Sequence, residues 1–234
     1  MFAFIDPCHA DPGADWLHRI DAAANRSKDA HLVLEVSVTD RTGAVNARTL
    51  EIWQKGADRR LVRFVAPPRL AGTGLLVPDG DTVYLYLPAY GRARRVVGEQ
   101  RGDAFMGTDF SLEDLSRLEW SDEYTAAVEA DEGDLVRLKL EPLLSSSHRD
   151  SAIRLWVRES DDIVARVEHL DASGAVRRRL LLDDIRPESG RPMAHHVVVE
   201  DLTLSRRTEA TVTTVELDRG LTDDRFTLTE LTRP

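Results

Sequence analysis

The sequence predicts a mainly β fold, in which one long antiparallel sheet curls into an incomplete β-barrel. Three observations lead to this prediction. Apolar and polar residues alternate with a period of two through most of the chain, short turn sequences separate these stretches, and helical periodicity is confined to the start and the middle. About 11–12 strands are expected, and open sheets rarely exceed ~10 strands without curling. The two helical segments are therefore expected to cover the concave side as a lid.

The first element is an amphipathic helix over residues 14–26. Its apolar residues Trp16, Leu17, Ile20 and Ala24 recur at steps of three and four residues. This spacing gives the helix an apolar stripe, which must pack on another element of the fold.

Strands with a period of two follow this helix. In the first strand Leu34 and Val36 face one side, and Glu35 and Ser37 face the other. Glycines in the fourth strand indicate a sharp bend or a close approach of another backbone. Strands are expected at residues 32–39, 44–55, 59–66, 70–77, 82–87, 123–130, 134–141, 152–158, 163–170, 175–185, 192–204 and 209–217.

Short turns connect most of these strands. Turn sequences at residues 131–133 and 172–174 have the spacing of hairpins, so consecutive strands are expected to be neighbours in an up-and-down order. Helices are expected only at the start and in the middle of the chain. After Leu217 a short tail remains, in which Phe226 and Leu228 are expected to seal one end of the barrel.

The central stretch, residues 84–115, is the most informative part of the sequence. It begins as a strand and returns through a second, basic strand at residues 93–97. Residues 98–107 then combine glycines and charges with the apolar pair Phe105 and Met106, which a solvated loop would not need. This stretch is therefore expected to pack onto the sheet.

Charged residues surround the second half of this stretch. Asp109 or Ser111 is expected to cap a short helix, because Glu113 and Asp114 would lie in its first turn and suit the positive end of the helix dipole. A basic cluster precedes this helix, and we interpret it as part of an ion-pair network that holds the central loop on the sheet. The basic residues are Arg92, Arg94, Arg95 and Arg101, and their expected partners are Asp103, Asp109, Glu113 and Asp114.

Composition narrows the classes of function. The chain has 31 basic and 41 acidic residues and a formal net charge of −10, which disfavours binding to nucleic acid. No apolar run approaches the roughly 20 residues that span a bilayer. The single cysteine, Cys8, excludes an internal disulfide and a cysteine-based zinc site. We expect residues 14–234 to form one domain and residues 1–13 to be a tail, either the remnant of a signal peptide or a segment without further role.

No motif predicts an enzyme. The sequence lacks the HExxH zinc motif and the GxSxG nucleophile motif, and we expect no catalytic residue, no metal site and no cofactor. Ser147 and His148 are adjacent in the sequence, but adjacency does not make the geometry of a catalytic triad. His195 and His196 lie in one expected strand, so their rings should point to opposite faces and cannot bind one metal together.

Several blocks of the sequence resemble one known family. LPAYGRARRV at residues 87–96, followed by RGDAFMGTDFSLEDL at residues 101–115, is similar to the signature of outer-membrane lipoprotein-sorting proteins related to the periplasmic carrier LolA. RFVAPPRLAGTGLLV at residues 63–77 and DDRFTLTEL at residues 223–231 resemble further blocks of that family, in the same order. The resemblance extends over nearly the whole chain from about Ala14 onward, and it implies the same incomplete barrel.

The resemblance also implies a function. It indicates a periplasmic, monomeric binding protein that holds the acyl chains of a lipoprotein or lipid in an apolar cavity and carries them toward the outer membrane. An inner-membrane lipid exporter and transient contact with a membrane are the implied partners, and nucleic acid is not. The alternative is a lipid-sensing module that resembles the lipid-binding domain of the regulator RseB.

The expected binding site combines inward faces of the strands with the central loop. Phenylalanine and methionine of this loop act either as a plug that fills the core or as a lid that leaves when an acyl chain enters, because the flexible thioether suits a surface that repacks. Basic residues nearby are expected to meet a lipid head group or to form ion pairs. The expected wall residues are Leu34, Val36, Leu50, Ile52, Val62, Phe64, Val83 and Leu85, the lid residues are Phe105, Met106 and Phe110, and the basic residues are Arg94, Arg95 and Arg101.

Overall fold

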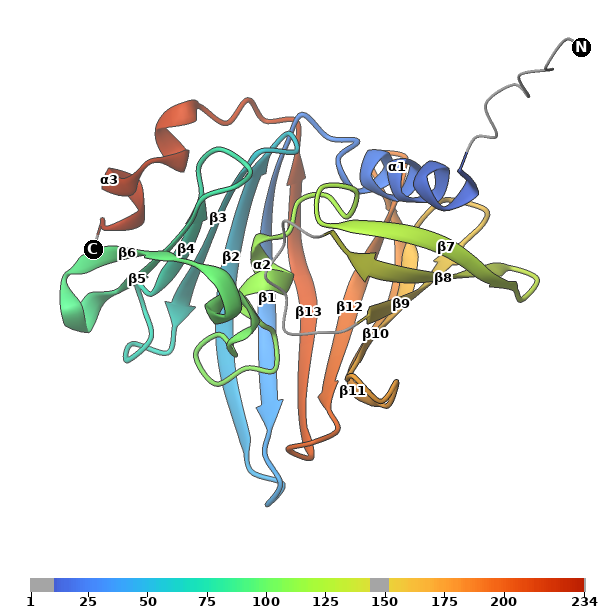
Figure 1. Cartoon of the computed structure of the whole chain (residues 1–234). Helices are drawn as coiled ribbons and strands as arrows, with labels where there is room; N and C mark the ends of the chain where they lie inside the picture. Colours follow the sequence, from blue (N-terminus) through green and yellow to red (C-terminus); the bar gives the residue numbers. More distant parts are fainter. Residues whose placement is uncertain (1–10, 144–151, 234) are drawn as a thin grey trace, which may run out of the picture.

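A computed structural model describes residues 11–143 and 152–233 and confirms the mainly β fold (Figure 1). The strands form one antiparallel sheet that does not close into a barrel. They are β1 (Asp29–Thr39), β2 (Val45–Lys55), β3 (Arg59–Ala66), β4 (Gly74–Val77), β5 (Val83–Leu87), β6 (Arg92–Val96), β7 (Tyr124–Asp131), β8 (Leu135–Pro142), β9 (Ala152–Arg158), β10 (Val164–Leu170), β11 (Val176–Glu188), β12 (Arg191–Asp201) and β13 (Arg206–Leu217). The α-helices are α1 (Pro12–Ala24), α2 (Leu112–Ser116) and α3 (Leu228–Leu231), and the 3₁₀ turns are η1 (Pro88–Tyr90), η2 (Gly98–Gly102) and η3 (Asp223–Phe226).

The strand order explains how the central stretch is placed. Across the sheet the order is β6-β5-β4-β3-β2-β1-β13-β12-β11-β10-β9-β8-β7. Consecutive strands pair, as predicted, except that β6 and β7 are the two edges and that the first and last strands pair in the middle, with Val36 opposite Ala210. The prediction of an unbroken up-and-down order is therefore wrong between β6 and β7. Residues 97–123 connect these edges by crossing the concave side of the sheet (Figure 1).

We call residues 98–118 of this connection the central segment. Its helix α2 begins at Leu112 and is capped by Ser111, one of the two predicted caps. The Ser111 side chain accepts a hydrogen bond from the backbone N–H of Asp114, and the Asp114 carboxylate accepts one from the backbone N–H of Ser111. This reciprocal capping box fixes a helix of only five residues.

The concave side holds two buried clusters. One cluster joins the central segment, through Phe105 and Leu112, to the inward residues of β1 to β6. The other joins α1, through Leu17 and Ile20, to the inward residues of β7 to β12. Phe110 of the central segment contacts both clusters. The two helical segments therefore cover different halves of the concave side.

Helix α1 lies close against the edge strand β7. The helix begins two residues earlier than predicted, because the Asp11 side chain accepts a hydrogen bond from the backbone N–H of Gly13. A Cβ atom at Gly13 would lie only 1.7 Å from the carbonyl oxygen of Ala126 on β7. Glycine is therefore required at this position for the first turn of α1 to approach the β7 backbone.

The C-terminal tail packs on the convex side, which differs from the prediction. Phe226 and Leu231 are buried there against Trp53, Leu61 and Leu76, which alternate with the inward residues of their strands. Helix α3 was not expected, and the prediction that Leu228 seals the barrel is wrong, because 45% of this residue is exposed. Leu231, one helical turn after Leu228, is buried instead.

Glycine at the start of β4 makes room for this tail. The fourth strand begins at Gly74 and not at Leu70 as predicted, because residues 68–72 form turns. A Cβ atom at Gly74 would lie 3.0 Å from a methyl carbon of Leu231 and 3.0 Å from the carbonyl oxygen of Val62. The prediction of a close approach at this glycine is confirmed.

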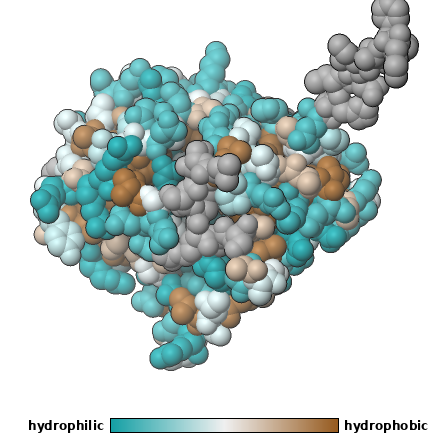
Figure 2. Space-filling model, in the orientation of Figure 1, coloured by the Kyte–Doolittle hydropathy of each residue, from teal (hydrophilic) through white to brown (hydrophobic). Residues whose placement is uncertain are grey.

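The outer surface is mainly hydrophilic. In the orientation of Figure 1, hydrophobic residues appear as small, separate patches among hydrophilic ones (Figure 2). Large apolar residues with more than half of their surface exposed are Val45, Tyr90, Val97 and Leu204. Within residues 11–143 and 152–233, no helix has the length and apolar character needed to cross a membrane.

Candidate functional site

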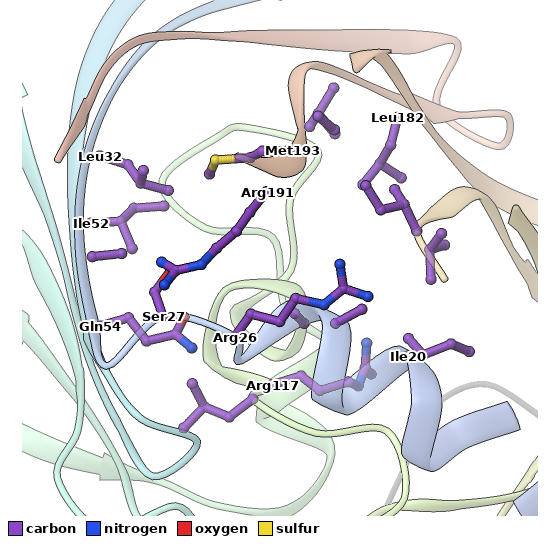
Figure 3. A pocket seen from close by; sticks show the side chains of 18 of the residues that line it. Ile20, Arg26, Ser27, Leu32, Ile52, Gln54, Arg117, Leu182, Arg191 and Met193 are labelled. Atoms are coloured by element: carbon purple, nitrogen blue, oxygen red, sulfur yellow. The ribbon is translucent and has the colours of Figure 1, made fainter. Parts of the chain in front are cut away.

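A cavity of about 460 Å³ lies on the concave side of the sheet, next to α1 and the central segment (Figure 3). This volume is within the range of small-molecule sites, roughly 300–1,000 Å³. In the view of Figure 3, Leu32 and Ile52 line one side, Leu182 and Ile20 of α1 line the opposite side, and Met193 lies between Leu32 and Leu182. Further apolar lining residues are Leu115, Leu118, Val167, Leu180, Val197 and Leu217.

Polar side chains form a continuous group on part of the lining (Figure 3). Arg191 Nη1 donates hydrogen bonds to Ser27 Oγ at 3.1 Å and to Asp218 Oδ2 at 2.7 Å. Close by, Gln54 Nε2 donates to Asn25 Oδ1 at 2.7 Å. Because Asn25 and Ser27 follow α1 directly, these bonds tie the end of that helix to β2 and β12.

Arg60 extends this polar group toward the central segment. Its Nε donates to Gln54 Oε1 at 3.2 Å, and its Nη1 donates to the carbonyl oxygens of Leu115 at 3.1 Å and Arg117 at 2.8 Å. Burial, together with the charge of Arg117, lowers the pKa of Arg60 to about 10. Arg60 therefore stays positively charged near neutral pH.

The predicted wall residues come together, but most of them do not line the cavity. All except Ile52 belong to one buried cluster, in which Phe64 and Phe105 are completely or almost completely buried. Ile52 packs against this cluster and is the predicted wall residue that lines the cavity. The central segment fills the concave surface in front of the others. A role of these residues in lipid binding stays a prediction.

The predicted lid residues differ in how they are packed. Phe105 is 1% exposed, and its ring stacks on that of Phe64 with the ring centroids 5.0 Å apart. Met106 and Phe110 are partly buried and pack against the same cluster. Phe105 thus fills the core between the central segment and the sheet, and it does not line the cavity.

Buried ion pairs hold the central segment on the sheet. Arg178 of β11 donates to both carboxylate oxygens of Asp114, at 2.6 and 3.0 Å. Arg206 of β13 lies 2.8 Å from Asp109 Oδ1, and the Thr208 hydroxyl donates to Asp109 Oδ2 at 2.8 Å. Burial alone would raise the pKa of Asp114, but the charge of Arg178 and other nearby cations holds it below its usual value. The Asp114 carboxylate, which attaches the segment to β11, thus favours its ionised form.

These pairs correct the predicted ion-pair network. Asp109 and Asp114 do not pair with the basic cluster that precedes them, because arginines of distant strands occupy those positions. Arg101 does form an ion pair, with Glu123 at 3.2 Å. Arg94 and Arg95 are exposed on the edge strand β6 and do not line the cavity. The arginines that line it are Arg26, Arg60, Arg117 and Arg191.

Sequence reasoning missed the cavity residues of the second half of the chain. Alternation predicted the strands that carry Val167, Leu180, Leu182 and Val197, but it did not say which face looks inward. Nothing in the sequence indicates that Arg60 lines the cavity, because a single polar residue in a strand is common. Its position opposite α2 depends on the whole sheet.

The other predicted features lie outside the cavity lining or outside the described residues. His195 is buried and lies 2.9 Å from Glu188 Oε1, whereas His196 lies 2.7 Å from Asp183 Oδ1, in agreement with rings on opposite faces. Cys8 and residues 145–148 lie outside the described residues. In the part of the chain that the structure describes, no three His, Cys, Asp or Glu residues are grouped so that they could hold a metal ion.

Comparisons with known proteins agree with this geometry. The structure of a DUF1329 family protein from Desulfovibrio piger matches with a TM-score of 0.84 and 25% identity, over 95% of this chain and 100% of that chain. A structure described as an outer-membrane lipoprotein-sorting protein domain, from Vibrio parahaemolyticus, matches with a TM-score of 0.84 and 22% identity over 96% and 100%. A LolA superfamily protein from Nitrosomonas europaea matches with a TM-score of 0.78 and 17% identity over 93% and 98%. No curated protein matches the chain.

These likenesses confirm the resemblance to lipoprotein-sorting proteins and the predicted fold. A family model with the description "Uncharacterized protein" matches residues 56–233. Since this match covers well over half of the chain, the protein belongs to that family, and its fold is that of the LolA superfamily.

Proposed function

We propose that this protein binds the acyl chains of a lipid or lipoprotein and carries them through the periplasm toward the outer membrane. The observation that carries the proposal is the largely apolar cavity of about 460 Å³ on the concave side of an open sheet. The likeness in fold to a lipoprotein-sorting domain and to a LolA superfamily protein supports this class of cargo. In this proposal the protein binds and transfers its cargo without making or breaking a covalent bond.

The apolar lining sets the energy of binding. Burial of hydrocarbon stabilises a complex by about 0.8 kcal/mol per methylene, so a sixteen-carbon chain gains on the order of 10 kcal/mol. This energy suffices to hold a chain during its passage through water. It also slows release, so delivery needs an acceptor with a better site or a protein segment that competes with the chain.

The central segment is the element that we propose as this competitor. Phe105 belongs to the buried cluster that includes the cavity residues Leu115 and Leu118, and an acyl chain that displaced it would gain the inward surface of β1 to β6. The variant with Phe105→Ser and Met106→Ser should therefore retain an acyl probe longer than the wild type, because its segment competes less. Unchanged retention would remove both residues from the mechanism.

The proposal also includes a donor of the cargo at the inner membrane and an acceptor at the outer membrane. A monomer receives its cargo from an inner-membrane exporter, touches membranes only transiently, and gives the cargo to an acceptor at the outer membrane. Transfer from loaded protein to acceptor vesicles tests this directly. Binding without transfer would favour the lipid-sensing alternative, in which the occupied cavity is a signal.

A variant that fills the cavity tests the binding site. Leu182 lines the cavity, so Leu182→Trp should displace about two methylenes of a bound chain and weaken binding of a fluorescent fatty acid by about 1.6 kcal/mol, or roughly fifteenfold. Leu202→Trp is the matched control, because Leu202 is 46% exposed and does not line the cavity. Equal affinities of both variants and the wild type would refute the cavity as the binding site.

A further inference from the structure

The charges that line the cavity include four carboxylates, and each of them has a partner of its own. Asp29 accepts hydrogen bonds from three successive backbone N–H groups, and the others bind basic side chains. Among the described residues, none of these four carboxylates forms a salt bridge with Arg60. The pairs are Asp29 with residues 219–221, Asp114 with Arg178, Asp162 with Arg19, and Glu188 with His195.

Three of the four lining arginines have a carboxylate partner as well. Arg191 lies 2.7 Å from Asp218, Arg117 lies 3.0 Å from Glu123, and Arg26 lies 3.8 Å from Asp162. Arg60 differs from them. Within residues 11–143 and 152–233 it forms no salt bridge, and its hydrogen bonds go to uncharged oxygens of Gln54, Leu115 and Arg117.

Arg60 thus places an uncompensated positive charge beside an apolar cavity. A guanidinium has five N–H donors, and its four hydrogen bonds leave one donor on Nη2. A buried charge without a partner is costly, and a partner that brings the opposite charge removes much of this cost. The bonds to the two carbonyls hold α2, but uncharged donors would suffice for that purpose. A charge at this place therefore suits an anionic ligand.

We propose that the cavity selects an amphiphile with a single anionic head group, a carboxylate or a phosphate monoester, whose charge lies against Arg60. The apolar chain of this ligand extends along Leu32, Ile52 and Leu182, which line the same cavity. The inference rests on the proposed acyl-chain binding and narrows its cargo to anionic lipids. An uncharged lipid of equal chain length binds less well, because it leaves the Arg60 charge without a partner.

The wild-type protein provides the first test. Myristate, myristoyl-lysophosphatidate and myristyl alcohol are each used to displace a bound fluorescent acyl probe. An ionic hydrogen bond predicts that at least one of the anions binds roughly tenfold to a hundredfold more tightly than the alcohol. The stronger of the two anions distinguishes a carboxylate from a phosphate ligand. Equal affinity of all three compounds overturns the anion preference but leaves acyl binding intact, whereas binding of none of them contradicts both proposals.

Variants of Arg60 test the residue assignment. Arg60→Gln keeps donors for the carbonyls of α2 but removes the charge, so it should lose the preference for the anion while it binds the alcohol as well as the wild type does. Arg60→Lys should retain the preference. Arg94→Met is the control, because Arg94 lies on the edge strand β6 and does not line the cavity. A preference that persists in Arg60→Gln overturns the assignment, and if this variant does not fold, the wild-type comparison still decides the anion preference.

Discussion

The attachment of the central segment leads to a prediction about stability. In the variant Asp114→Asn the side chain can still accept the capping bond from Ser111, but it no longer carries a charge. The side chains of Asp114 and Arg178 are only 6% and 10% exposed, so the substitution leaves a buried guanidinium without its carboxylate. Removal of one partner of a buried ion pair costs about 3–5 kcal/mol. We expect the free energy of unfolding to fall by that amount.

Urea denaturation followed by tryptophan fluorescence measures this change. Asp184→Asn is the matched control, because Asp184 and Arg186 form an exposed ion pair, and its unfolding should be nearly unchanged. The double variant with Asp114→Leu and Arg178→Met removes both buried charges and should recover much of the lost stability. If Asp114→Asn loses less than about 1 kcal/mol, as is usual for surface pairs, the argument that this pair holds the segment is refuted.

Three further predictions concern the same elements. Phe105→Ala should lower the free energy of unfolding, measured by urea denaturation, by about 3–5 kcal/mol, because it leaves a cavity next to Phe64. A loss no larger than that of a surface substitution would contradict this packing. Gly13→Ala should lower the melting temperature and change the near-ultraviolet circular dichroism, since its Cβ cannot lie 1.7 Å from the Ala126 oxygen; an unchanged spectrum would argue against the close contact. Because the pKa of Asp114 is lower in the folded state, its charge stabilises the fold above the unfolded-state pKa of about 3.9. This stabilisation is lost as the pH falls through the folded-state pKa. The stability of the wild type should therefore decline more steeply in acid than that of Asp114→Asn. Parallel pH profiles would refute this linkage.

Local periodicity made most of the fold predictable. Residues 59–66 and 152–158 were predicted as strands with the bounds that the structure has, because alternation and flanking turns define such strands without reference to the rest of the chain. The capping chemistry likewise pointed to Asp109 or Ser111, and Ser111 is the cap in the structure. The C-terminal helix α3 was missed because its four residues are too few to show helical periodicity.

The candidate site was less predictable, because it depends on contacts between distant residues. Adjacency in sequence suggested that the acids near Asp114 pair with the arginines of β6. The sheet instead brings Arg178 to Asp114, 64 residues further along the chain. In the same way the cavity takes Ile52 from one half of the sheet and Leu182 from the other. Such pairings follow from the strand order, which periodicity does not specify.

The proposed function depends on an acyl chain that binds in the cavity. Native mass spectrometry of the protein purified from the envelope of the cells that produce it, followed by lipid extraction, tests this claim most directly. We expect one acyl-bearing molecule per protein, and the Leu182→Trp variant should carry less of it. A protein that is empty and also fails to take up a fluorescent fatty acid would contradict the account.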